Sequence, residues 1–89
     1  MKSCVLDASH DSRAKIFAAL ARDLAFPGGA ARNLDALWDV LRTDIKGPIA
    51  ITWKDSAAAR RALGGDYEPI AKLLRDLAAA RADVTVRFE

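Results

Sequence analysis

Three short runs of apolar and β-branched residues divide the chain. They are "KSCVLD" at the start, "PIAITW" over Pro48–Trp53 and "DVTVRF" over Asp83–Phe88, and each has the composition of a strand. Because helical patterns fill both intervals, the strands are expected to be parallel and joined by right-handed crossovers. The sequence therefore predicts an α/β fold.

The first interval contains two helical patterns. One is formed by apolar residues at helical spacing, namely Ile16, Phe17, Leu20 and Leu24. It follows the candidate caps Asp11 and Ser12 and stops before Pro27. The second begins at the candidate cap Asn33 and ends near Asp44, because the following "KGP" cannot continue a helix.

The second interval also predicts two helices. One follows Ser56 and runs to Leu63, where Gly64–Gly65 ends it. The other is expected to be capped by Asp66 and tolerates Pro69 in its first turn. Its core stripe consists of Ile70, Leu73, Leu74 and Leu77.

The resulting order βααβααβ predicts one domain over residues 1–89, with three parallel strands and about four helices. Three strands make a narrow sheet, so we expect a two-layer α/β arrangement with short or shielded edges. The strand order stays open at this point.

The segment "NLDALWD", Asn33–Asp39, places two carboxylates one helical turn apart, on Asp35 and Asp39. Like charges at this spacing oppose a helix by roughly 0.2–0.5 kcal/mol. Trp38 lies at the border between these carboxylates and the apolar stripe. The side chains expected to be buried on that stripe are Leu34, Leu37 and Leu41.

Two interpretations fit this helix. In the first, the aromatic ring and the carboxylates form a binding surface. In the second, Trp38 is a core residue, Asp35 complements the positive helix N-terminus, and Asp39 pairs with Arg42. Local pattern alone favours the second interpretation.

Charge and composition exclude several classes of function. The net charge is only +2, and Arg60–Arg61 is the one adjacent basic pair, so nucleic-acid binding is not expected. No apolar run is long enough for a signal peptide or a membrane span, so we expect a cytoplasmic protein. The lone Cys4 fits a small buried residue of the first strand.

Catalytic interpretations find little support. A hydrolytic dyad of Asp35 and Asp39 would need two environments that separate their pKa values, and the sequence supplies none. Polar residues do follow the first two strands, at Asp7, His10, Asp11, Lys54 and Asp55. With a single histidine and no glycine-rich loop after a strand, they are better explained as turn and cap residues. No enzyme activity, cofactor or metal is expected.

The segment "NLDALWD", preceded by "LAFPGG" and followed by "GPIAITW", resembles the barstar family of bacterial ribonuclease inhibitors. The resemblance implies a three-stranded parallel sheet flanked by helices. It also implies an immunity protein or antitoxin that binds a secreted ribonuclease inside the producing cell. There the second helix and the loop before it plug the active site, with carboxylates in place of RNA phosphates.

Carried over by position, Asp39 is the expected main anchor, Asp35 accepts bonds from the nuclease, and Asp76 extends the acidic patch. Asn33 matches as a structural cap. The nuclease-binding residues that the resemblance implies, together with two positions where this chain departs from the family, are Asp35, Trp38, Asp39, Asp76, Arg42 and Gly29.

The departures concern charge and aromatic content. Where the family typically has tyrosines before the second helix, this chain has "GGAA", Gly28–Ala31, and Arg42 brings a cation to the acidic helix. The resemblance implies a one-to-one heterodimer with a ribonuclease and a monomer when free. A barstar-like interaction module with a non-nuclease partner is the alternative.

Overall fold

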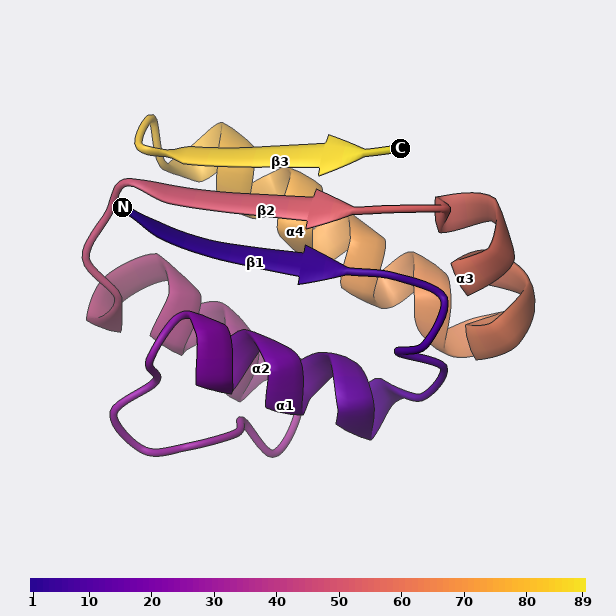
Figure 1. Cartoon of the computed structure of the whole chain (residues 1–89). Helices are drawn as coiled ribbons and strands as arrows, with labels where there is room; N and C mark the ends of the chain where they lie inside the picture. Colours follow the sequence, from indigo (N-terminus) through magenta and orange to yellow (C-terminus); the bar gives the residue numbers. More distant parts are fainter.

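The computed structural model describes all 89 residues and has a three-stranded parallel sheet of order β1-β2-β3. Helices gather beneath one face of the sheet, with α3 beyond the carboxyl end of β2 (Figure 1). The elements are β1 Lys2–Leu6, α1 Arg13–Asp23, α2 Leu34–Asp39, the π-helical η1 Val40–Asp44, β2 Ile49–Trp53, α3 Ser56–Leu63, the 3₁₀ turn η2 Gly64–Asp66, α4 Tyr67–Ala80 and β3 Val84–Phe88. The predicted fold class and the order βααβααβ are confirmed, and the open strand order is settled.

The two faces of the sheet differ sharply. Buried side chains alternate along β1 and β2 and face the helices, and they are Cys4, Leu6, Ile49, Ile51 and Trp53. On the opposite face Val5 is 46% exposed and aligns with Thr52 of β2, which aligns in turn with Arg87 of β3. The expected two-layer arrangement is therefore present, with one face of the sheet left open. Cys4 is buried, as predicted.

The helices begin and end mostly as the sequence indicates. The Ser12 side chain caps α1 by accepting the Lys15 N–H at 3.2 Å. The prediction that Asp66 caps α4 is wrong, because Asp66 has helical backbone angles and makes no side-chain capping bond. The chain passes from α3 through η2 into α4, so this position lies inside a nearly continuous helical path. No helix is both long and apolar enough to cross a bilayer.

The second helix covers its expected span but changes type midway, since α-helix gives way to π-helix at Val40. Leu37 and Leu41 are completely buried. Leu34 is only partly buried, contrary to prediction, because it lies in the first turn at the rim of a surface groove.

Arg81 fastens the C-terminal end of η1 to the end of α4. Its Nη1 donates to the Leu41 carbonyl at 2.7 Å and to the Ile45 carbonyl at 2.8 Å. Its Nε and Nη2 donate to the two Asp83 carboxylate oxygens at 3.0 and 2.8 Å. This fork satisfies carbonyls left free at the helix end, and its hydrogen bond holds the pKa of Asp83 below its usual 3.8.

Gly47 lies where the chain enters β2, before the cis Gly47–Pro48 peptide bond. A Cβ at this position would overlap the Asp83 carboxylate, which Arg81 holds in place. The close approach therefore requires glycine.

We predict that Gly47→Ala lowers the free energy of unfolding by about 1–3 kcal/mol, because the methyl group would displace the Asp83 carboxylate from Arg81. Gly28→Ala is the matched control, since nothing lies within 4 Å of a Cβ there. Urea unfolding of both variants measures the difference. Equal stability of the two variants would contradict the proposed close packing.

Candidate functional site

The candidate site begins with the cap of α2. The Asn33 carboxamide oxygen accepts the Ala36 N–H at 2.8 Å and fixes the first turn. From there helical spacing turns Leu37 into the core and leaves Asp35 and Asp39 exposed, as predicted. Packing of the apolar stripe thus determines where the two carboxylates point.

Neither of these carboxylates has a partner in the chain. Eight ion pairs are present, and none includes Asp35 or Asp39. The pairing of Arg42 with Asp39 that local pattern favoured is not formed. Instead the Arg42 guanidinium lies 5.9 Å from the centre of the Trp38 ring, in a cation–π contact.

A shallow groove of about 220 Å³ runs between α2 and α4. Its lining includes Asp35, Trp38 and Asp76, so the fold brings together positions from α2 and α4 that lie far apart in the sequence. Asp76 is not free, because the Lys72 ammonium lies 2.8 Å from its carboxylate. Asp39 and Arg42 continue along the same helical segment beyond the groove.

Gly29 lies apart from this groove. It has a positive φ of 77° and its N–H donates to the Phe26 carbonyl at 3.2 Å, which closes a turn in the loop before α2. The neighbouring residues Ala30 and Ala31 line a second groove with residues of α1. This second groove was not predicted, because the sequence does not show that the loop folds back on α1.

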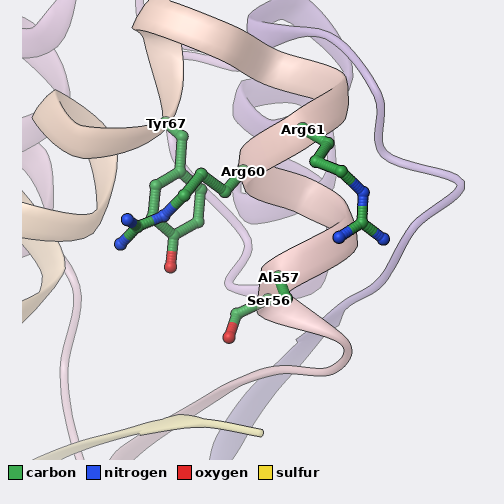
Figure 2. Close-up of a pocket in the computed structure, with 5 residues that line it drawn as sticks. All are labelled: Ser56, Ala57, Arg60, Arg61 and Tyr67. Carbon is green, nitrogen blue, oxygen red and sulfur yellow. The ribbon is translucent and has the colours of Figure 1, made fainter.

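Another concave surface lies on α3 and is lined by Ser56, Ala57, Arg60, Arg61 and Tyr67 (Figure 2). The guanidinium groups of Arg60 and Arg61 point to opposite sides of α3. Arg60 is also paired with Glu68 at 3.1 Å and lies 5.1 Å from the Tyr67 ring centre. The two arginines therefore do not converge on one anion.

Residues 1–89 match the family model described as "Barstar (barnase inhibitor)". The chain belongs to the barstar family. The match covers the whole chain, and it agrees with the parallel three-stranded sheet and its flanking helices. Barstar is an inhibitor family.

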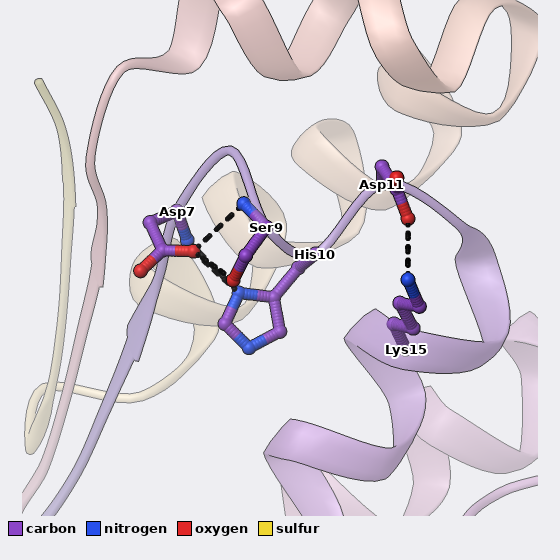
Figure 3. A network of polar contacts seen from close by, with 5 residues as sticks. All are labelled: Asp7, Ser9, His10, Asp11 and Lys15. Atoms are coloured by element: carbon purple, nitrogen blue, oxygen red, sulfur yellow. Dashed lines mark hydrogen bonds and ion pairs between the residues drawn. The ribbon is translucent and has the colours of Figure 1, made fainter.

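In this barstar-family chain the polar cluster after β1 has the residue types of a hydrolase but not the geometry (Figure 3). The Asp7 carboxylate accepts bonds from the Ser9 hydroxyl at 2.5 Å and the Ser9 N–H at 2.9 Å, and these bonds lower its pKa. His10 Nδ1 lies 3.2 Å from the same carboxylate oxygen. The Ser9 hydroxyl thus bonds to the carboxylate. A serine nucleophile would instead need a bond to the imidazole, which accepts its proton.

The unpaired carboxylates of α2 imply a conflict between stability and function. We predict that Asp39→Ala raises the free energy of unfolding by roughly 0.5–1 kcal/mol, because it removes like-charge repulsion and adds a better helix former. Asp35→Ala is expected to gain less, since Asp35 complements the helix N-terminus. Urea unfolding at low and high salt checks this, and a destabilised Asp39→Ala would refute it.

Proposed function

We propose that this barstar-family protein inhibits a ribonuclease secreted by its own bacterial cell, and that it binds the enzyme one-to-one in the cytoplasm. The observation that carries the proposal is the pair of exposed, unpaired carboxylates on Asp35 and Asp39, on a helix whose opposite side is buried. A ribonuclease active site that holds RNA phosphates offers the cations that these carboxylates lack. The family match supports the same class of partner.

The surroundings of each carboxylate indicate its share in binding. Asp39 and Asp35 can accept charge-assisted bonds without breaking any ion pair of their own. Asp76 must first give up Lys72, so it is expected to contribute less. Trp38 supplies aromatic area beside them, and tryptophan and arginine are the residue types most common at binding hot spots.

A partner that is not a nuclease is the second candidate. Arg42 stacked on Trp38 and the loop "GGAA" favour this alternative, because both alter the surface that would enter a basic active site. Both candidates use the same face of α2. They are separated by whether the captured partner degrades RNA and whether this chain stops it.

We predict that Asp39→Ala weakens inhibition of the cognate ribonuclease by about two orders of magnitude or more, as expected for a central charged anchor. Asp35→Ala and Asp76→Ala should have smaller effects. Asp66→Ala is the matched control, because Asp66 is exposed and has no ion pair but lies at the α3–α4 junction. The measurement is RNA cleavage at increasing inhibitor concentration, and the chain alone should leave RNA intact.

Equal inhibition by Asp39→Ala and the original chain would move the binding surface away from α2. Turnover that co-purifies with the chain and disappears in Asp35→Ala would instead refute the assignment as a non-enzyme.

Arg42 is expected to determine which nuclease is accepted. We predict that Arg42→Thr weakens the cognate complex, because a cation beside the acidic face is tolerated only if the partner supplies a carboxylate or carbonyl opposite it. The same change should strengthen binding to a barnase-like enzyme with a uniformly basic active site. Affinities of both proteins for both nucleases test this, and equal strengthening would make Arg42 an incidental surface charge.

A further inference from the structure

A second groove of about 400 Å³ lies between the first turns of α1 and the loop that leads into α2. It is lined by Arg13, Ala14, Phe17, Ala30, Ala31 and Arg32. Arg32 directly precedes Asn33, the cap of α2, so the groove adjoins the helix that carries Asp35 and Asp39. The groove therefore lies next to the first turn of α2.

The floor of the groove is apolar and aromatic. The Phe17 ring is 4% exposed, and the Arg13 guanidinium lies 5.0 Å from its centre. The loop side is built from alanines, and added Cβ atoms at Gly28 and Gly29 would meet nothing within 4 Å. Small side chains thus leave the hollow open, and its volume suits a flat aromatic ring.

The charges at the rim have one sign. Neither Arg13 nor Arg32 has an ion pair or a side-chain hydrogen bond, and no acidic residue lines the groove. Of the seven other arginines, Arg42 and Arg61 also lack a carboxylate partner, and the five that have one are Arg22, Arg60, Arg75, Arg81 and Arg87. Two unpaired guanidinium groups beside an apolar floor favour a ligand in which an anionic group adjoins an apolar one.

We infer that this groove docks an acidic-aromatic segment of the partner protein, an aromatic side chain with an aspartate or glutamate beside it. The inference rests on the proposed function, since the segment belongs to the same partner that α2 binds. The ring enters the groove beside Arg13 and Arg32, and the neighbouring carboxylate accepts their free N–H groups. The cations of the partner then bind the carboxylates of α2, and its anions bind the arginines of the groove.

The probe for this surface is a capped peptide of sequence Gly-Asp-Phe-Glu-Gly, titrated to millimolar concentration into the uniformly ¹⁵N-labelled protein. Amide shifts confined to residues 13–17 and 30–32 are expected. The peptides Gly-Asn-Phe-Gln-Gly and Gly-Asp-Ala-Glu-Gly remove the charge and the ring separately, and each should shift these amides less. Shifts elsewhere, or none, would overturn the inference.

Two kinds of variant separate charge from shape. Arg13→Gln and Arg32→Gln should each weaken peptide binding by roughly three- to tenfold, with Arg87→Gln on the open sheet face as the matched charge control. Ala30→Tyr fills the groove but keeps both arginines, and it should abolish binding. Undiminished binding to Ala30→Tyr would show simple charge attraction and refute a docking groove.

The test distinguishes failure here from failure of the proposed function. No peptide shifts, together with inhibition that depends on Asp39, would refute the groove and leave the inhibitor proposal intact. Peptide binding in the groove without inhibition of any nuclease would refute the inhibitor proposal and leave the groove intact. Shifts of the same amides on concentrating the protein alone would assign the groove to a second copy of the chain and overturn the inferred occupant.

Discussion

The end of the second helical segment depends on one side chain from elsewhere in the chain. Arg81 donates to the carbonyls of Leu41 and Ile45 and also to the carboxylate of Asp83. Those carbonyls belong to the π-helical end of the segment, where the regular helical ladder no longer satisfies them. The Arg81 side chain is only 15% exposed, so its bonds to the two carbonyls are partly buried, whereas its bonds to Asp83 lie at the surface. The fork holds the end of η1 against the end of α4, while the apolar stripe of α2 determines where its carboxylates point.

With both ends of the segment held, the acidic face itself needs no internal partners. Asn33 fixes the first turn, Arg81 fixes the last, and Leu37 and Leu41 anchor the middle. The repulsion between the two carboxylates is small beside the burial of two leucines, each worth roughly 1.5–3 kcal/mol. The fold can therefore keep two like charges adjacent and unpaired. Such a preorganised surface loses little conformational entropy when it binds.

Sequence patterns sufficed for the strands, the helices and the carboxylate positions, because these follow from local periodicity. The 3.6-residue repeat alone predicts that Leu37 and Leu41 are buried and that Asp35 and Asp39 are exposed. The π-helical turn and the missing Asp66 cap could not be predicted, because they depend on how the helix ends meet other elements. Arg81 illustrates the difference, since two of its four bonds reach carbonyls 40 and 36 residues earlier in the chain.

Charge is unevenly distributed over this barstar-family chain. Unpaired carboxylates on Asp35 and Asp39 follow the Asn33 cap, unpaired arginines at positions 13 and 32 precede it, and Arg42 adds one unpaired cation to the acidic segment. A uniformly basic partner would meet repulsion at the arginines, and a uniformly acidic one would meet it at α2. Like-charge contacts of this kind disfavour wrong partners, and specific interfaces combine them with attractive contacts to the right one. On the proposed function, partner choice therefore depends on matching both signs of charge around the cap of one helix.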